Sequence, residues 1–201
     1  MLKDLKSGKA PGPDQLKKED LCLDLVVTSD ILAHIFQYSL DIGQLPDIWK
    51  VANVVPIFKK GNRQEPSNFR PVSLTCICCK LLEHIVLSNI HTDLDNIIVS
   101  SQHGFRRGLS CTTQLVSTVD RIMKLVDENN TVHAAILDFS KAFDKVPHNL
   151  LVNKLAISNI DICVVKWIAD FLSRRLQRVV VEGVESSSLA VTSGVPQGSV
   201  L

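Results

Sequence analysis

Residues 132–144 have the sequence VHAAILDFSKAFD, and this stretch decides more about the fold than any other part of the chain. It opens with small and branched apolar residues, a composition typical of a buried strand, so we expect a strand over 132–138. The run ends on the carboxylate of Asp138. An unpaired charge buried at the end of a strand is costly, and Asp138 therefore needs a partner or a cation.

The bulk properties fit one domain, or one large piece of a longer domain, with a buried core. The chain has 201 residues, of which 45% are hydrophobic and 21% are charged, as in ordinary globular proteins. Its net charge of +1 creates no global basic field, so any nucleic-acid binding must rest on local clusters. The longest apolar runs are too short to cross a bilayer, and we expect no membrane partner.

Six cysteines lie at positions 22, 76, 78, 79, 111 and 163. No second Cys/His pair stands at finger-like spacing from the group at 76–79, so packed free thiols are favoured over a metal site. Free thiols indicate a reducing compartment, and we expect an intracellular protein of the nucleus, the cytoplasm or both.

The apolar spacing predicts an α+β fold that is rich in helix, with a small antiparallel sheet. The clearest helix spans 112–128, where apolar residues recur at intervals of four, three and four. Further helices are expected over about 17–40, 74–91, 150–155 and 161–173. Strands are expected over 51–58 and 132–138, and over an antiparallel pair at 178–182 and 189–192.

The position of Asp138 suits a ligand of divalent cations. Nucleotidyl transfer needs such cations and positive charge near the phosphates, and two ions about 4 Å apart activate the attacking oxygen and stabilise the leaving one. These hard cations take carboxylate and carbonyl oxygens. A carboxylate that caps a helix or forms a salt bridge in a strand-to-helix turn is the structural alternative, which position alone favours.

Six sequence blocks together resemble the reverse transcriptases of LINE-type (non-LTR) retrotransposons, over almost the whole chain. The blocks are GKAPGPD at 8–14, IFKKGN at 57–62, NFRPVSL at 68–74, QHGFRRG at 102–108, LDFSKAFDKV at 137–146 and GVPQGSVL at 194–201. Each block alone is weak, but the six follow the family's order and approximate spacing. The resemblance implies part of a right-hand polymerase fold, with mainly fingers over 1–130 and an incomplete palm over 131–201.

The resemblance also implies an RNA-directed DNA polymerase that uses an RNA template, a DNA primer and deoxynucleoside triphosphates. Asp138 and the backbone carbonyl of Phe139 then bind catalytic Mg²⁺, of which the complete enzyme holds two. Phe143 matches a steric gate that excludes the 2′-hydroxyl of ribonucleotides. Asp144 caps the following turn or touches the metals or the substrate, and Lys141 is expected to be a solvated turn residue.

The remaining blocks match residues that bind substrate and template. Arg70 matches the arginine that holds the incoming triphosphate, with Lys59 or Lys60 assisting, and Gln197 lies against the new base pair. Template contacts are expected from Gln102, Gly104, Phe105, Arg106, Gly198 and Ser199. Arginines that add phosphate contacts, or simply lie on the surface, are Arg106, Arg107, Arg174, Arg175 and Arg178.

One feature of the family is missing, because the chain contains no Asp-Asp pair. In the family that pair lies on the next hairpin and supplies the remaining metal carboxylates, so we expect a domain truncated before it and inactive alone. A non-catalytic nucleic-acid-binding remnant is the main alternative. An RNA-directed RNA polymerase conflicts with Phe143, and a purely structural helical protein leaves the ordered polar blocks without a purpose.

Overall fold

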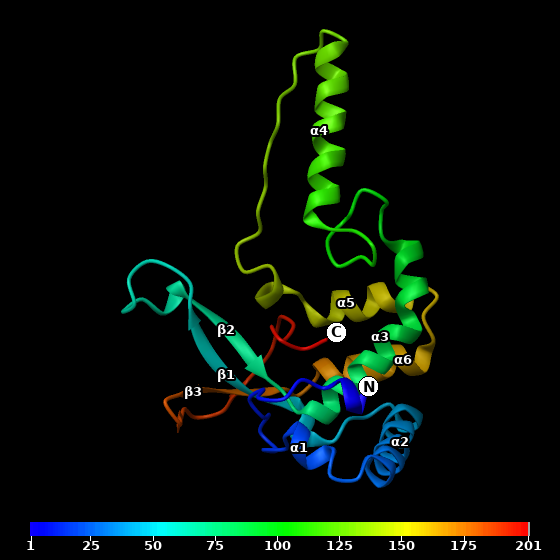
Figure 1. Ribbon diagram of the computed structural model, residues 1–201, viewed down its shortest axis with the longest axis vertical. Helices are drawn as coiled ribbons and strands as arrows, with labels where there is room; N and C mark the ends of the chain where they lie inside the picture. Colours follow the sequence, from blue (N-terminus) through cyan, green and yellow to red (C-terminus); the bar gives the residue numbers. More distant parts are fainter. Residues whose placement is uncertain (201) are drawn as a thin grey trace. The chain divides into compact units, whose positions relative to one another are not determined.

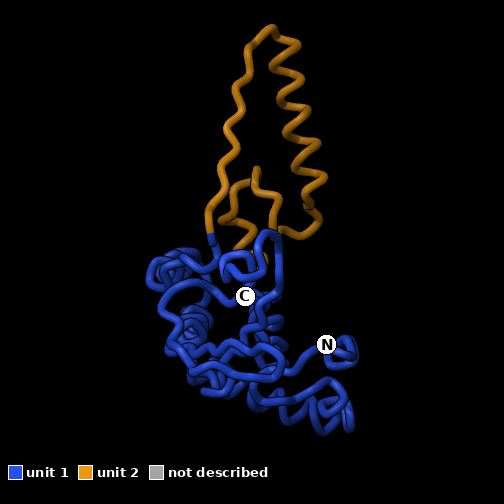
Figure 2. The backbone as a smooth tube through the Cα atoms, turned by 90° about the vertical axis from the view of Figure 1, so that its left-hand side faces the viewer, with its two compact units in different colours: residues 1–90, 141–201 blue, residues 91–140 orange. Residues whose placement is uncertain are grey.

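The computed structural model describes residues 1–200, which divide into two compact units (Figures 1 and 2). The first unit joins residues 1–90 to residues 141–201, and the second comprises residues 91–140. The helix α3, Ile77–Ile97, belongs to both units. Over residues 1–200, no helix combines the length and the apolar character that crossing a membrane requires.

The helices of the first unit confirm most of the expected positions. They are η1 (Leu2–Asp4), α1 (Lys18–Leu21), α2 (Leu25–Ile42), η2 (Asp47–Lys50), η3 (Pro66–Asn68), η4 (Phe143–Lys145), α5 (His148–Ala156) and α6 (Ile162–Leu172). The single helix expected over 17–40 is wrong, because the chain breaks between α1 and α2. The Asp24 side chain accepts hydrogen bonds from the backbone N–H groups of Val26 and Val27 and so starts a new helix.

A five-stranded sheet forms the other layer of the first unit, with strand order β2-β1-β3-β4 and β5 paired to β3. The strands are β1 (Val51–Phe58), β2 (Phe69–Leu74), β3 (Leu176–Val181), β4 (Val184–Glu185) and β5 (Leu189–Ala190). β1 and β2 form an antiparallel hairpin, but β1 and β3 run parallel, with Val51 opposite Leu176. The expectation of a purely antiparallel sheet is therefore wrong. The α-helical segment between these distant strands permits the parallel direction.

Aromatic side chains fill the core of the first unit. Trp167 and Phe171 of α6 stack with ring centroids 5.8 Å apart, and both are almost fully buried. The Trp167 indole N–H donates to the Ser39 hydroxyl of α2 at 3.0 Å, which leaves this buried donor satisfied. α6 is thereby fixed against α2.

A buried ion pair joins α6 to the start of β1. The Lys50 ammonium donates to the Asp170 carboxylate at 2.7 Å, and the backbone N–H of Leu45 donates to its other oxygen at 2.7 Å. Burial raises the pKa of the Asp170 carboxyl, but the hydrogen bonds from Lys50 and Leu45 outweigh it, so the pKa lies below its ordinary value.

The second unit contains the end of α3 and the amphipathic helix α4, Cys111–Asp127, which confirms the helix expected over 112–128. The Ser110 hydroxyl caps α4 by accepting from the Thr113 N–H. The strand expected over 132–138 is wrong: these residues have no regular secondary structure and pair with no strand among residues 1–200. A strand forms only where a neighbour takes its backbone hydrogen bonds. Ile136 and Leu137 are consequently at least 90% exposed.

Replacing Asp170 by asparagine is expected to destabilise the first unit by about 3–5 kcal/mol, because Lys50 then stays buried without its counter-charge. Since the folded state lowers the pKa of Asp170, the stabilisation is complete above a pH of about 4 and is lost as the pH falls further. Urea unfolding at several pH values between 7 and 3 should show the free energies of unfolding of the parent chain and of Asp170→Asn converging in acid.

Arg174→Ala is the control. Arg174 also pairs with Asp170, but the Arg174 side chain is 71% exposed. The substitution should cost less than about 1 kcal/mol. Equal losses in both variants at pH 7 would refute the importance of the buried pair.

Candidate functional site

A groove of about 680 Å³ in the first unit carries a strong excess of positive charge. The charged side chains that line it are Lys59, Arg63, Arg70, Lys141 and Asp144. Four cations against one carboxylate create a local positive field although the net charge of the chain is only +1. Such a field favours a ligand with several negative charges, and the arginines can bind oxyanions in bidentate fashion.

The hairpin β1–β2 positions the cations on one side of the groove. Its register places Ile57 opposite Arg70, and the Lys59 N–H donates to the Asn68 carbonyl at 2.9 Å. The Arg63 guanidinium lies over the Phe58 ring, 4.5 Å from its centroid. This cation–π contact restricts Arg63 in a turn that is otherwise exposed.

The loop of residues 193–199 contributes Gln197 to the groove and is anchored at its start and at its middle. At its start, the Gly194 N–H donates to the Val146 carbonyl at 2.9 Å, and the Nε2–H of His148 donates to the Gly194 carbonyl at 2.7 Å. At its middle, the Ser73 N–H of β2 donates to the Gln197 carbonyl at 2.7 Å. This hydrogen bond attaches the loop to β2, an edge strand of the sheet.

A glycine at position 198 allows the loop to approach β2 this closely. Gly198 has φ of +116°, and a Cβ there would lie 2.8 Å from the Ser73 carbonyl oxygen. Any larger residue would combine a strained backbone with a steric clash. The Gly-rich composition of this block is thus explained by packing.

A buried carboxylate of α3 holds the end of the loop. Glu83 is fully buried, and its Oε2 accepts a hydrogen bond from the Val200 N–H at 2.7 Å. The sequence does not distinguish Glu83, because a charged residue in an amphipathic helix is usually solvated. A glutamate at a position inside the apolar run of this helix is the only signal that could have found it.

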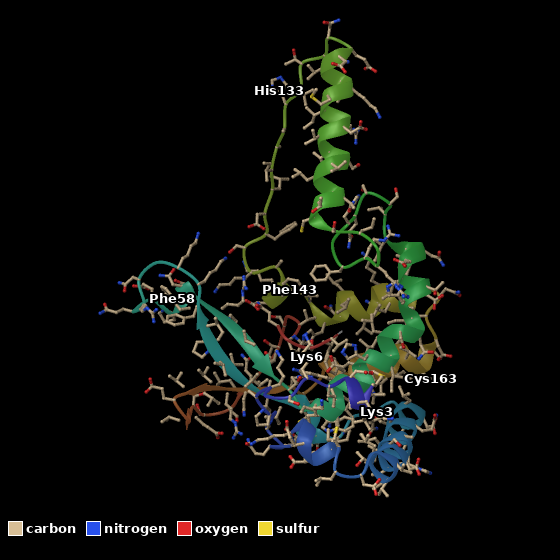
Figure 3. All side chains as sticks on the ribbon, in the orientation of Figure 1. Lys3, Lys6, Phe58, His133, Phe143 and Cys163 are labelled. Atoms are coloured by element: carbon tan, nitrogen blue, oxygen red, sulfur yellow. The ribbon has the colours of Figure 1, made fainter. Side chains whose placement is uncertain are left out.

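The structure brings together three of the predicted substrate residues: Lys59, Arg70 and Gln197 all line the groove. Lys60 is exposed and does not line it. Phe143, which begins η4 and is labelled in Figure 3, is not among the residues that line the groove. The roles of Lys59, Arg70, Gln197 and Phe143 in binding stay predictions.

Asp138 and Phe139 lie in the extended segment that follows α4, and both are exposed. Within residues 91–140, Asp138 forms no hydrogen bond or ion pair. The same range contains no cluster of three His, Cys, Asp or Glu side chains suited to a metal ion.

The predicted template block at 102–106 has structural contacts of its own. The Gln102 amide donates to the Gly104 carbonyl at 3.2 Å, and Phe105 is 91% exposed. Arg106 pairs with Asp95 at 3.2 Å and donates to the Val99 carbonyl. Arg106 therefore has a structural partner in addition to the predicted role.

One predicted phosphate contact is wrong, because Arg175 is 1% exposed. Its guanidinium lies over the Phe171 ring and donates to the Phe171 carbonyl at 3.0 Å. Burial lowers the pKa of this guanidinium. Arg175 is thus a core residue.

Arg63, Lys141 and Asp144 also line the groove. The motifs indicated no binding role for Arg63 or Lys141 and left the role of Asp144 open. The signal for Arg63 is its place in the basic turn of residues 59–63, which begins with two lysines. For Asp144 the structure supplies the missing information: its Oδ1 accepts from the Gln197 side-chain N–H at 3.0 Å.

The cysteine cluster of 76–79 consists of buried free thiols, as expected. Burial raises the pKa of Cys76 to about 12 and that of Cys78 to about 11. Burial also raises the pKa of Cys79. The three groups therefore remain protonated at neutral pH and act as packing residues.

Comparisons with known proteins agree with this arrangement of blocks. Residues 57–201 match the family described as reverse transcriptase (RNA-dependent DNA polymerase). The chain is 33% identical, over 96% of its length, to the RNA-directed DNA polymerase from mobile element jockey of Drosophila melanogaster. It is 30% identical, over its whole length, to the probable RNA-directed DNA polymerase from transposon BS of the same species.

A more distant match is the retrovirus-related Pol polyprotein from type-1 retrotransposable element R2 of Popillia japonica, 25% identical over 96% of the chain. The chain spans 21%, 22% and 26% of the lengths of these three relatives.

Gly198→Ala is expected to detach the loop from β2, because the new Cβ would meet the Ser73 carbonyl oxygen at 2.8 Å. Its matched control is Gly183→Ala, where φ is +81° but no atom lies within 4 Å of the added Cβ. The control should cost about 1–2 kcal/mol for its left-handed backbone, and Gly198→Ala at least about 1 kcal/mol more. Hydrogen exchange of the Ser73 amide should accelerate only in Gly198→Ala; unchanged protection would contradict the proposed contact.

Proposed function

We propose, because this chain belongs to the reverse transcriptase (RNA-dependent DNA polymerase) family, that it forms part of the RNA-directed DNA polymerase of a non-LTR retrotransposon. Its substrates are deoxynucleoside triphosphates, added to a DNA primer on an RNA template. Residues 1–130 contribute mainly to the fingers and residues 131–201 to the palm. The charged groove of the first unit is the proposed nucleotide site.

The convergence of Lys59 and Arg70 with Gln197 on one groove carries this proposal. A nucleoside triphosphate is a polyanion with planar oxygen faces, which a guanidinium binds in bidentate fashion and an ammonium neutralises as a point charge. Arg63 and Lys141 add charge to the same groove. An amide such as Gln197 contributes a donor and an acceptor for the neutral parts of a nucleotide.

Phe143 is proposed to select the sugar. An aromatic ring beneath the deoxyribose leaves no room for a 2′-hydroxyl, which is the group that distinguishes RNA from DNA. The side chain of Phe143 is partly exposed at the start of η4, in the same unit as the groove.

Asp138 and the Phe139 carbonyl are proposed as ligands of catalytic Mg²⁺. Both groups are hard oxygen donors, and the Asp138 carboxylate is exposed. When bound, two Mg²⁺ ions supply charge stabilisation at the attacking and leaving oxygens. One carboxylate does not suffice for two ions, and the 201 residues contain no Asp-Asp pair to complete the set.

Template contacts are proposed for two segments, one in each unit. In the second unit they involve Gln102, Gly104, Phe105 and Arg106, where the exposed Phe105 ring offers a stacking surface for a base. In the first unit they involve Gly198 and Ser199, whose loop borders the groove.

Arg70→Ala is expected to weaken the binding of Mg²⁺–dATP by about 10- to 100-fold, the range for losing hydrogen bonds to a charged group. Lys59→Ala should weaken it by about 5- to 10-fold, because a single ammonium contributes less. Isothermal titration of the 201-residue chain measures both values.

Lys60→Ala is the matched control, since Lys60 follows Lys59 directly but does not line the groove. Its affinity should stay within about twofold of the parent chain, as expected for an exposed charge. Equal affinities in Lys59→Ala, Lys60→Ala and Arg70→Ala would exclude the groove as the triphosphate site.

The 201-residue chain is further expected not to extend a primer. Its only proposed metal carboxylate is Asp138, and residues 1–200 form no three-ligand cluster. A radiolabelled DNA primer on an RNA template, incubated with Mg²⁺ and the four dNTPs, checks this expectation. Extension that depends on the template would disprove it, provided that Asp138→Asn abolishes the signal and so excludes a contaminating polymerase.

A further inference from the structure

We propose that Asp144 is a positioning residue that fixes the orientation of the Gln197 amide in the groove; this inference rests on the proposed nucleotide site. The Gln197 Nε2–H donates to the Asp144 Oδ1 at 3.0 Å, and both side chains are half-buried. Both also line the groove and a neighbouring cavity of about 440 Å³.

The charge on Asp144 permits only one orientation of the amide. An ionised carboxylate has acceptor atoms alone, so it attracts the NH₂ group of Gln197 and repels the amide oxygen. In the reverse orientation, two acceptors would face each other at 3.0 Å without a hydrogen between them. The amide oxygen is therefore kept away from Asp144.

Backbone contacts hold the segments that carry Asp144 and Gln197 against each other. The Val195 N–H donates to the Phe143 carbonyl at 2.9 Å, and the Ser193 hydroxyl donates to the Asp144 carbonyl at 3.2 Å. Gly194 approaches the Asp144 backbone so closely that an added Cβ would lie 2.7 Å from it. With both backbones fixed, the side-chain hydrogen bond restricts the remaining freedom of Gln197 and not the fold of the loop.

The fixed amide offers a ligand an oxygen acceptor at a constant position. Phosphate oxygens are themselves acceptors and cannot use it, whereas a sugar hydroxyl is a donor and can. In the proposed nucleotide site, the cations take the phosphates and a sugar hydroxyl meets Gln197, because the loop that carries Gln197 is hydrogen-bonded to Phe143, the residue proposed to lie beneath the sugar. Asp144 acts through Gln197 and does not itself touch the substrate.

The test compares the affinities of Mg²⁺–dATP and Mg²⁺–ddATP, which lacks the 3′-hydroxyl, for the 201-residue chain and its variants. The parent chain should prefer dATP by about fivefold, the contribution of one neutral hydrogen bond. Asp144→Ala should lose this preference while its affinity for ddATP stays unchanged. Asp144→Asn should weaken the preference, because the asparagine amide can donate as well as accept and so permits both orientations of the Gln197 amide.

Gln177→Ala is the control, since Gln177 lines the neighbouring cavity but not the groove. It should retain the parent preference. Two results would overturn the inference: an undiminished preference in Asp144→Ala, or an equal loss of both affinities, which indicates a merely structural role.

A second readout separates this inference from the proposed function. In ¹⁵N–¹H spectra without nucleotide, Asp144→Ala should shift the side-chain amide signals of Gln197, and Gln177→Ala should leave them unmoved. If the parent chain binds neither nucleotide, the proposed function fails, and this shift alone decides whether Asp144 orients Gln197. Unmoved Gln197 signals in Asp144→Ala would refute the pairing.

Discussion

The carboxylate of Asp170 determines how the two halves of the first unit meet. It lies in α6, yet it accepts hydrogen bonds from Leu45 and Lys50, which precede β1. β3 follows α6 after a short turn, so the same carboxylate fixes the starts of both β1 and β3. Their parallel pairing, with Val51 opposite Leu176, begins directly beside this ion pair. Without it, Lys50 would be a buried charge at the point where the sheet starts.

The sheet in turn supports the loop that borders the groove. β2 donates one backbone hydrogen bond to Gln197, and Gly198 permits the close approach that this bond requires. The turn around Asp144 holds the other end of the loop. The positive side chains of the groove come from the hairpin and from Lys141, whereas Gln197 comes from the loop. A chain with almost no net charge thereby concentrates positive charge at one surface.

Local sequence patterns predicted the elements whose stability is local. The helix α4 and the strand β1 were found because their apolar periodicity and their flanking turn residues agree. The cluster of Lys59, Arg70 and Gln197 was inferred from the family's motifs, and the groove brings those residues together. The direction of β3 relative to β1, and the bond between Asp144 and Gln197, depend on contacts between distant residues and left no local signal.

The strand expected over 132–138 shows the limit of local patterns most clearly. Its composition favours a strand, but a strand also needs a neighbour, which residues 1–200 do not provide. Composition therefore indicates the preference of a segment, and only the rest of the fold decides whether that preference is satisfied.

The insertion of residues 91–140 between the two parts of the first unit has a consequence for synthesis on the ribosome. β1 ends at Phe58, but its parallel neighbour starts only at Leu176. At usual translation rates, β1 waits on the order of ten seconds for that neighbour to be made. During this interval an apolar edge with unpaired backbone groups is open to other nascent chains. A chaperone that covers this edge during translation would therefore protect the chain.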